Sequence, residues 1–411
     1  MDDEEPQIIK PGFEKETPKK DDEEKKDEIK IEEDQKEDNK IGEDKIVEEK
    51  KDEEKDEDED NEEIQEEPPL EIKKIEDLEK ITEKIDRLEI EQLKESAKIV
   101  EKIKATKFEK LEVLSLNSTE INTIEFLFND NFKSLIILEL KENGITSLKD
   151  ISKIPAVDLK VLDLSSNQID SIEEIKSGRF KDLEILILSN NKIKDISPIP
   201  DGSFTKIKKL DLSNNQIKSI ENLGDHETLS NLESLYINEN QIEDISVLKK
   251  EIFKLLKELQ LNNNKIKKID DLEYVKFTEL EELMLYGNEI KFIDPLTRAD
   301  FKKLKILNLG KNQIENVNTL EKSSFKDLEK LDLFDNNITN IEFIDKIPFK
   351  NINELDISFN KLKSILPLLK VTFVNLKDLK IEGNEPLDYS KPEIEQLYKA
   401  YNIKYTFNSI L

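Results

Sequence analysis

The chain has 411 residues, of which 36% are hydrophobic and 39% charged, and its formal net charge is −30. Its 9 glycines and 13 prolines are too few turn formers for a many-turned β-sandwich or barrel. Since charged residues outnumber apolar ones, the core must be thin, and an elongated fold accommodates a thin core better than a sphere does. The chain has no cysteine, which excludes disulfides, thiolate metal sites and cysteine nucleophiles.

The start of the chain indicates where the protein works. The segment Met1-Asp2-Asp3-Glu4-Glu5 lacks the basic and apolar parts of a secretory signal, and no apolar run approaches the roughly 18 residues that span a bilayer. We therefore expect a cytoplasmic protein, with the nucleus as an alternative, and no membrane partner. A nucleic-acid partner is also disfavoured, because affinity for a phosphate backbone comes mainly from clustered lysine and arginine.

Residues 1–69 form a separate compositional segment. They contain 33 acidic and 13 basic residues, in runs such as residues 52–60, and very few apolar ones. Burial of so few apolar side chains cannot offset the cost of ordering the backbone, roughly 1–2 kcal/mol per residue. The sequence predicts a disordered acidic tail that ends at Pro68-Pro69, with folded structure from Leu70.

Residues 70–110 are expected to close the N-terminal end of the fold. Apolar residues between Leu70 and Val100 recur every three or four positions, which predicts an amphipathic helix over the open end of the core; they are Ile75, Leu78, Ile81, Ile85 and Leu88. A coiled-coil partner for this helix is the weaker alternative. The next apolar residues resemble half of the repeat described below and predict a degenerate capping repeat; they are Ala97, Val100, Ile103 and Phe108.

Residues 111–386 consist of twelve repeats. The pattern Leu-x-x-Leu-x-Leu-x-x-Asn-x-Ile returns every 24 residues, with one interval of 25. Its ninth position is Thr119 in the first repeat and afterwards Asn143, Asn167, Asn191, Asn215, Asn240, Asn264, Asn288, Asn312, Asn336, Asn360 and Asn384. A second half, Ile-x-x-Ile-x-x-Leu-x-x-x-x-Phe, supplies aromatics at Phe108, Phe132, Phe180, Phe204, Phe253, Phe277, Phe301, Phe325, Phe349 and Phe373.

This spacing predicts the shape of one coil. In Leu-x-Leu both side chains lie on one face of a strand, since side chains alternate with period two. Each repeat should add one short strand to a parallel sheet, and the longer second half should make the stack curve with the sheet on its concave side. The asparagines should bond backbone groups where each strand ends. The phenylalanines should form a buried spine, and residues 387–411 should form a C-terminal cap with a helix over 393–398 and a strand over 403–407.

The segment Leu162-Asp163-Leu164-Ser165-Ser166-Asn167-Gln168-Ile169 resembles the leucine-rich-repeat superfamily. The second half of each repeat, Ile-x-x-Ile-x-x-Leu, is similar to the repeat subtype of the phosphatase-1 regulatory subunit and to that of bacterial internalins. The resemblance covers residues 97–390 and implies an α/β fold: a right-handed solenoid with a concave parallel sheet. Members of this superfamily mostly bind proteins, so the resemblance implies a protein partner.

Outward positions of the predicted sheet suggest where a partner binds. Large apolar side chains are expected there at Tyr236, Met284, Tyr286, Phe334 and Phe359, with acidic ones between them at Asp211, Asp332, Asp356, Glu258, Glu282 and Asp335. Aromatics on a rigid concave surface are typical of binding sites, and the acidic residues favour a basic or amphipathic protein segment. The alternative is that the aromatics only fill space and that the recurring aspartates only solvate the strands.

Nothing in the sequence indicates catalysis. His226 is the only histidine, no catalytic constellation surrounds it in the sequence, and no phosphate-binding glycine loop occurs. We therefore expect no enzymatic activity, no cofactor and no metal site. The sequence predicts a monomeric interaction scaffold or regulatory adaptor. The alternatives are an acidic chaperone of basic, histone-like proteins and a phosphatase regulatory subunit, both suggested by resemblance alone.

Overall fold

The chain divides into two units, Met1–Gln65 and Glu66–Leu411. The computed structural model describes residues 70–401 except 178, 203, 226, 386 and 389–391. The predicted disordered tail of residues 1–69, the last strand over 403–407 and His226 lie outside the described residues.

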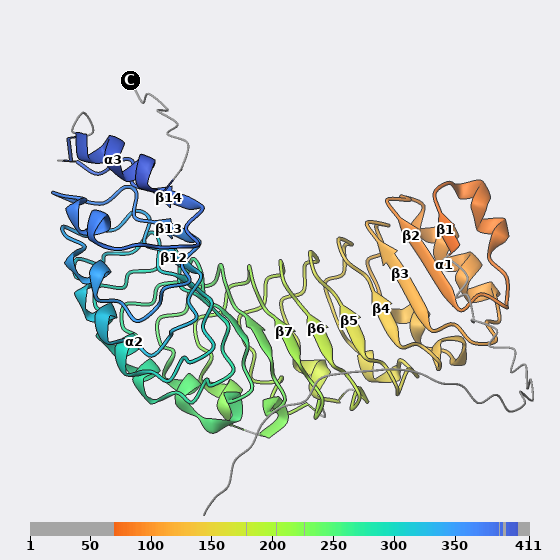
Figure 1. The fold of residues 1–411 in the computed structure, drawn as a ribbon. Coiled ribbons are helices and arrows are strands. Elements are labelled where there is room, and N and C mark those ends of the chain that lie inside the picture. The colour runs from red at the N-terminus through yellow and green to blue at the C-terminus, as the bar shows by residue number, and fades with distance from the viewer. Residues whose placement is uncertain are drawn as a thin grey trace, which may run out of the picture. The chain divides into compact units, whose positions relative to one another are not determined.

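A single parallel sheet of fourteen strands runs through the second unit, with the strands in sequence order (Figure 1). The strands are β1 (Leu70–Ile72), β2 (Arg87–Glu91), β3 (Val113–Asn117), β4 (Ile137–Glu139), β5 (Val161–Asp163), β6 (Ile185–Ile187), β7 (Lys209–Asp211), β8 (Ser234–Tyr236), β9 (Glu258–Gln260), β10 (Glu282–Met284), β11 (Ile306–Asn308), β12 (Lys330–Asp332), β13 (Glu354–Asp356) and β14 (Asp378–Lys380). Each of the twelve repeats supplies one strand, from β3 to β14, which confirms the prediction. The repeats stack in register, so that Leu114 pairs with Leu138 and Leu138 with Leu162.

The prediction of one amphipathic helix over residues 70–100 is wrong. Two strands, β1 and β2, occupy part of that segment, and they extend the sheet by pairing with each other and with β3. Leu88 and Ile90 are fully buried and alternate with half-buried or exposed glutamates, which is the pattern of a strand with one face on the core. The α-helix at this end is α1 (Ser96–Ala105), which buries Ile99 and Ile103.

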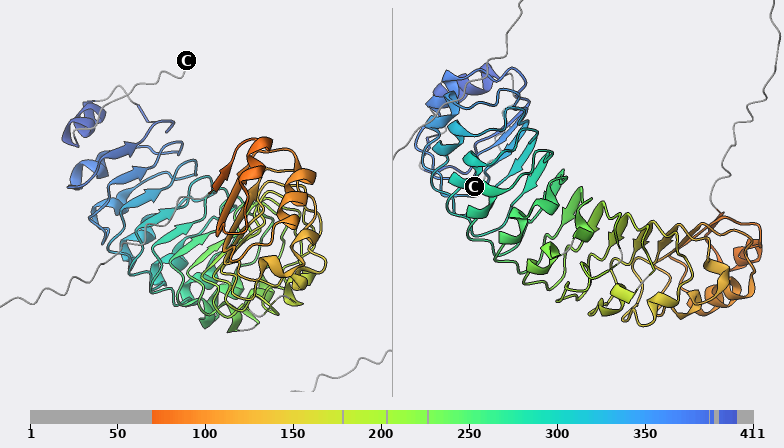
Figure 2. Two further views of the ribbon diagram at one scale, coloured as in Figure 1. Left: turned by 90° about the vertical axis from the view of Figure 1, so that its right-hand side faces the viewer. Right: turned by 90° about the horizontal axis from the view of Figure 1, so that it is seen from below.

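The second half of most repeats forms short helical turns. The 3₁₀ helices are η1 (Ile75–Lys80), η2 (Glu125–Leu127), η3 (Asp130–Phe132), η4 (Ile151–Lys153), η5 (Glu173–Ser177), η6 (Glu221–Gly224), η7 (Glu227–Leu229), η8 (Ser246–Lys249), η9 (Glu251–Phe253), η10 (Asp270–Tyr274), η11 (Asn318–Lys322), η12 (Glu342–Asp345) and η13 (Leu366–Lys370), and one α-helix, α2 (Asp294–Arg298), stands among them. These turns lie on the outer side of the arc and the strands on its inner side (Figure 2). The sheet therefore presents a concave face to solvent.

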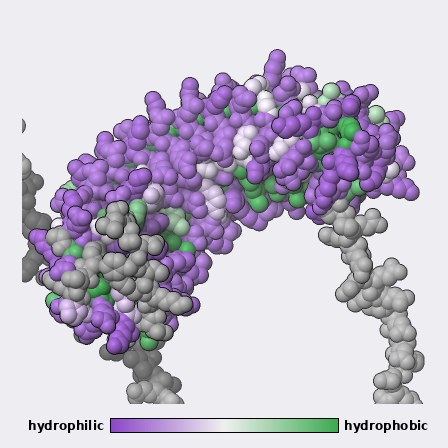
Figure 3. Space-filling model, turned by 90° about the horizontal axis from the view of Figure 1, so that it is seen from above, coloured by the Kyte–Doolittle hydropathy of each residue, from purple (hydrophilic) through white to green (hydrophobic). Residues whose placement is uncertain are grey.

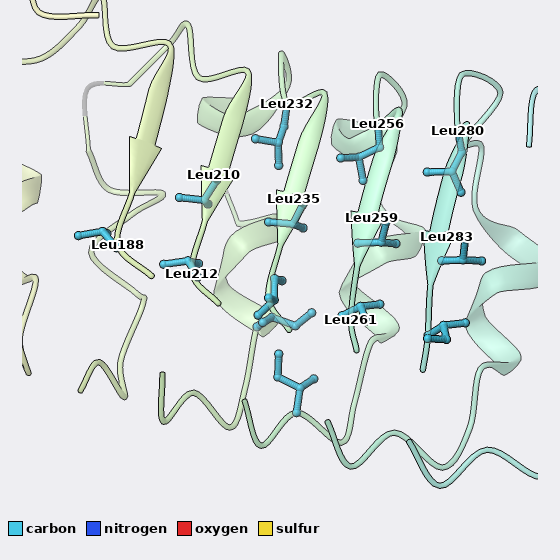
Figure 4. Packing of buried hydrophobic residues seen from close by; sticks show 14 of the residues in the cluster. Leu188, Leu210, Leu212, Leu232, Leu235, Leu256, Leu259, Leu261, Leu280 and Leu283 are labelled. Atoms are coloured by element: carbon cyan, nitrogen blue, oxygen red, sulfur yellow. The ribbon is translucent and has the colours of Figure 1, made fainter. Parts of the chain in front are cut away.

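The core fills the space between the strands and the outer turns. Leucines from successive repeats, such as Leu210, Leu235 and Leu259, point into it one above another (Figure 4), and they are fully buried. All ten phenylalanines of the predicted spine are buried. Ring centroids lie 6.4 Å apart for Phe277 and Phe301 and 5.8 Å apart for Phe325 and Phe349. The role predicted for them is confirmed: they pack the interior.

The asparagines form the predicted ladder. In mid-stack, the Asn264 side-chain NH₂ donates to the carbonyl oxygens of Leu261 (3.1 Å) and of Ile237 in the preceding repeat (3.0 Å). Its carbonyl oxygen Oδ1 accepts from the backbone N–H of Ile242 at 3.0 Å. Asn264 is buried, and without it the N–H of Ile242 would lie in the interior without a partner. The two carbonyl oxygens also accept from the neighbouring asparagines of the ladder, that of Ile237 from Asn240 and that of Leu261 from Asn288. The ladder holds each coil to the one before it.

A short helix covers the C-terminal end, as predicted. Helix α3 (Pro392–Ala400) buries Ile394 and Leu397. The hydroxyl oxygen of Tyr401, just beyond it, lies 3.0 Å from the carbonyl oxygen of Leu368 and 2.7 Å from that of Val371, and its one hydrogen can be donated to either. Tyr401 thereby ties the helix to η13 and the residue after it, and the end of the core is covered.

Candidate protein-binding surface

The outward-facing residues of the strands form two columns that run across the concave face, one on each side of the buried central leucines. The first column contains Val113, Ile137, Val161, Ile185, Lys209, Ser234, Glu258, Glu282, Ile306, Lys330, Glu354 and Asp378. The second column contains Ser115, Glu139, Asp163, Ile187, Asp211, Tyr236, Gln260, Met284, Asn308, Asp332, Asp356 and Lys380.

The structure places the predicted site residues on this face or at its edge. Glu258 and Glu282 stand in the first column, and the second column holds Tyr236, Met284, Asp211, Asp332 and Asp356. Tyr286 and Phe334 follow two residues after the second column, and Asp335 and Phe359 three residues after it. Apart from Asp335 and Phe359, which are exposed, all of these side chains are half-buried.

Two of the aromatic residues are brought together and two are not. The rings of Phe334 and Phe359, on adjacent repeats, meet edge-on with centroids 5.3 Å apart. The ring of Tyr286 instead covers Gly310 of the next repeat, where an added Cβ would come within 2.9 Å of it. Tyr236 lies two strands away from Met284. The aromatics therefore mark separate points along the face.

Phe359 occupies an unusual backbone position. The residue before each ladder position is left-handed in every repeat, and the φ of Phe359 is +52°. Glycine and asparagine tolerate this conformation best, and glycine occurs there at Gly287 and Gly383. Phe359 is 40% exposed, so an aromatic stands in solvent where the backbone favours a smaller residue.

Tyr236 is held by its neighbours. Its hydroxyl group donates to the carboxylate of Glu258, and the Lys209 ammonium lies 4.5 Å from the ring centroid. Burial, and then the Glu258 carboxylate, raise the pKa of the Tyr236 hydroxyl. This tyrosine is therefore fixed in one orientation, with an ammonium group over its ring.

Charges at the border of the sheet face are paired between repeats. Just before the first column, glutamates alternate with lysines from one repeat to the next. The ammonium-to-carboxylate distances are 2.7 Å for Lys208–Glu184, 2.6 Å for Lys257–Glu233 and 2.7 Å for Lys305–Glu281. This border is therefore close to neutral.

Several carboxylates in the middle of the face have no such partner. Among the described residues, no lysine or arginine nitrogen lies within 4.0 Å of the carboxylates of Glu139, Asp163, Asp211, Glu282 or Asp332. Burial raises the pKa of Asp163, and the nearby Glu139 raises it further. The pKa of Asp332 is raised by burial and by Asp356. These carboxylates thus have no direct ion pair, and lysines such as Lys141, Lys330 and Lys380 act on them only from beyond 4.0 Å.

The sequence reasoning missed an aliphatic patch on the same face, composed of Val113, Ile137, Val161, Ile185 and Ile187. These residues occupy the four consecutive strands β3 to β6, and all but the buried Val113 are half-buried. Figure 3 shows hydrophobic surface on the inner side of the arc toward its N-terminal half. Reading the repeats down each column, in place of searching for aromatic outliers, would have found it.

The comparisons with known proteins agree with this fold. The family described as "Leucine Rich repeats (2 copies)" matches residues 157–201, 181–225, 205–250 and 230–274, and "Leucine rich repeat" matches residues 254–314 and 278–338. These matches show leucine-rich repeats over residues 157–338, and the fourteen-stranded parallel sheet has the solenoid fold of such repeats. No curated protein matches the chain.

Three solved structures share the fold. An internalin of Listeria monocytogenes is 24% identical, with a TM-score of 0.56 over 73% of this chain and 87% of that one. A leucine-rich-repeat protein of Leptospira interrogans is 22% identical, with a TM-score of 0.53 over 78% and 71%. The ectodomain of the Arabidopsis thaliana receptor kinase GASSHO1/SCHENGEN3, solved in complex with CASPARIAN STRIP INTEGRITY FACTOR 2, is 20% identical, with a TM-score of 0.51 over 73% and 38%.

Two other kinds of site were sought in the part of the chain that the structure describes. None of the helices there is both long and apolar enough to cross a membrane. Nor do three or more histidine, aspartate or glutamate side chains come together there in a way that could hold a metal ion.

Proposed function

We propose that this protein is a non-enzymatic interaction scaffold or regulatory adaptor that binds a basic, amphipathic segment of a protein partner on its concave sheet face. One observation carries the proposal: carboxylates at the border of the face are paired with lysines, whereas Asp163, Asp211, Glu282 and Asp332 within it are not. A partner that brings lysine or arginine would supply the missing counter-charges.

The aromatic residues support the same proposal. Phe334, Phe359 and Tyr286 place apolar rings beside the second column, and large apolar groups on a rigid surface commonly carry binding energy. The related Arabidopsis ectodomain was solved with a bound factor. We extend this mode of use, a leucine-rich-repeat solenoid that holds a partner, to the present chain.

A second candidate function is a chaperone of basic, histone-like proteins. It is favoured by residues 1–69, in which 33 residues are acidic and 13 basic, because a highly charged segment attracts oppositely charged proteins over a long range. A phosphatase regulatory subunit remains a prediction from the resemblance of the repeats, and co-purification of phosphatase activity tests it. In each case we propose a monomer in the cytoplasm or the nucleus.

The test compares two double variants of the full chain in affinity capture from a lysate of the source organism. Tyr286→Ala with Phe334→Ala removes two rings from the proposed surface. Tyr274→Ala with Phe292→Ala is the matched control, because these aromatics are 64% and 73% exposed and lie outside the strands. We expect the Tyr286→Ala, Phe334→Ala variant to lose the captured proteins while its melting temperature changes by only a few degrees. Equal capture by both pairs would remove the aromatics from the site.

A further inference from the structure

The aliphatic patch forms a second, separate subsite on the concave face. Ile137, Val161 and Ile185 lie in register on adjacent strands, with Val113 at one end and Ile187 beside them. Lys209 ends the column, and its ammonium turns toward the Tyr236 ring, 4.5 Å away. The patch is therefore separated from the aromatic residues of the proposed binding surface by a charged side chain.

Acidic side chains border this patch and no basic residue pairs with them. Glu139 and Asp163 follow Ile137 and Val161 on the same strands, two positions on, and so lie on the same face. Neither carboxylate has an ion pair among the described residues. Lys141 is the basic residue that acts on Asp163, but it lowers the pKa less than burial and Glu139 act to raise it. The flank of the patch is thus negative.

The negative charge of Glu139 and Asp163 disfavours some binding partners for the aliphatic patch and favours others. A second copy of the chain, docked by the same face, would bring its own Glu139 and Asp163 against these carboxylates, and like charges repel. Residues 1–69 carry a large excess of acidic residues and are disfavoured for the same reason. A partner segment with aliphatic side chains along one side and lysine or arginine beside them fits both features.

The spacing of the patch selects the conformation of that segment. Neighbouring strands are about 4.8 Å apart, so the column presents one aliphatic side chain every ~4.8 Å across the strands. A helix presents one residue per turn, about every 5.4 Å, on one face. An extended chain presents same-face residues about every 6.7 Å. Val113 is buried, so the accessible column spans two intervals, from Ile137 to Ile185, and over these the mismatch is about 1 Å for a helix and about 4 Å for a strand.

We propose that the aliphatic patch of β3 to β6 binds an amphipathic helix, laid across the strands, with one aliphatic residue per turn and basic residues facing Glu139 and Asp163. The proposal rests on the proposed function, because it defines one class of partner for the same face. It adds a location and a partner conformation that the aromatic residues do not specify.

The experiment is a selection of 18-residue peptides, displayed on phage, against the full chain. The enriched peptides are synthesised, and their affinities are measured by fluorescence anisotropy for the wild type and three variants. Ile137→Thr with Val161→Thr alters the patch with little change in side-chain size at position 161. Ile306→Thr is the matched control, because Ile306 is half-buried in the same column on β11. Tyr286→Ala with Phe334→Ala tests the aromatic residues.

We expect peptides with an aliphatic residue at every third or fourth position and with adjacent lysine or arginine. Their affinity should fall by roughly tenfold or more in the Ile137→Thr, Val161→Thr variant and stay within about twofold in the Ile306→Thr control. If the patch variant does not fold, the pair Glu139→Gln with Asp163→Asn, which preserves side-chain shape, takes its place, and the same loss is expected.

Three results would overturn the inference: no enriched peptide, enriched peptides with apolar residues at every second position, or equal affinity for the wild type and the patch variant. A wild-type mass in solution equal to that of a dimer, with the monomer restored by the patch variant, would instead assign the patch to a second copy. Peptides whose affinity falls only for the Tyr286→Ala, Phe334→Ala variant would contradict this inference and leave the proposed function standing. Peptides whose affinity falls for neither variant would contradict both this inference and the proposed function.

Discussion

The rings of Phe334 and Phe359 lie edge-on to each other in adjacent repeats, 5.3 Å apart between centroids. Phe334 follows the second column of its repeat by two residues and Phe359 follows that of the next repeat by three. Phe359 has a left-handed backbone, with a φ of +52°. Such a conformation costs a bulky residue on the order of 1 kcal/mol or more. The position therefore costs stability, which supports a role for the ring outside the core.

Phe359→Ala and Phe349→Ala should have very different effects, although the two residues are ten positions apart. Phe349 is fully buried and stacks on Phe325, so its truncation should lower the free energy of unfolding by about 3–5 kcal/mol. Phe359→Ala should change it by less than about 1 kcal/mol, because the ring is 40% exposed and alanine, which also carries a Cβ, has a similar cost at the left-handed position. Urea unfolding followed by circular dichroism measures both. Similar losses would mean that Phe359 belongs to the core.

Asn264→Ala should destabilise the protein more than Thr119→Ala. The first change leaves the buried backbone N–H of Ile242 without a partner and removes one of two donors from each of the carbonyl oxygens of Ile237 and Leu261, at a cost of about 3 kcal/mol. Thr119 stands at the first ladder position and donates from its hydroxyl to the Leu116 carbonyl oxygen at 3.0 Å, so its loss should cost about 1 kcal/mol. Equal shifts of the urea midpoint would contradict the ladder.

Asp163→Asn should stabilise the protein at neutral pH. The pKa of Asp163 is raised in the folded state, so the charged form is disfavoured there compared with the unfolded chain. Asparagine keeps the acceptor for the Ser165 backbone N–H, 2.8 Å away, and carries no charge. As the pH falls through the raised folded pKa and then through the ordinary value near 4, the wild type regains this stability and the difference should vanish. Denaturant titrations of both proteins at pH 7 and pH 3.5 measure it. A difference that persists or grows on acidification would contradict the assignment.

The sequence predicted the repeating part of the fold well, because the physical signal is repeated twelve times. A position such as Asn264 or Phe349 is supported by its equivalents in the other repeats, so both the asparagine ladder and the buried spine could be recognised. The N-terminal end lacks that support. Ile85, Leu88 and Ile90 fit a helical period and a strand alternation about equally over so few residues, and only pairing of β2 with β3 decides between them.

The binding surface was predictable only in part. The period-two rule places Tyr236 and Asp332 on the outward face, but which side chains meet depends on rotamers and on the turn after each strand. The rings of Phe334 and Phe359 meet although Phe359 has a left-handed backbone, a conformation that a bulky residue does not suggest. The aliphatic patch was missed for another reason. Valine and isoleucine are ordinary strand residues, and only their succession in one column distinguishes Ile137 and Val161 from core positions.

The most direct test of the account asks which part of the chain captures partners. The full chain and residues 70–411 are compared side by side by affinity capture from native lysate at moderate salt, with mass spectrometry of the retained proteins. We predict one discrete set of proteins on both, because the concave face lies within residues 70–411. Retention of mainly basic proteins by the full chain, with nothing retained by residues 70–411, would contradict it and assign the activity to the acidic segment.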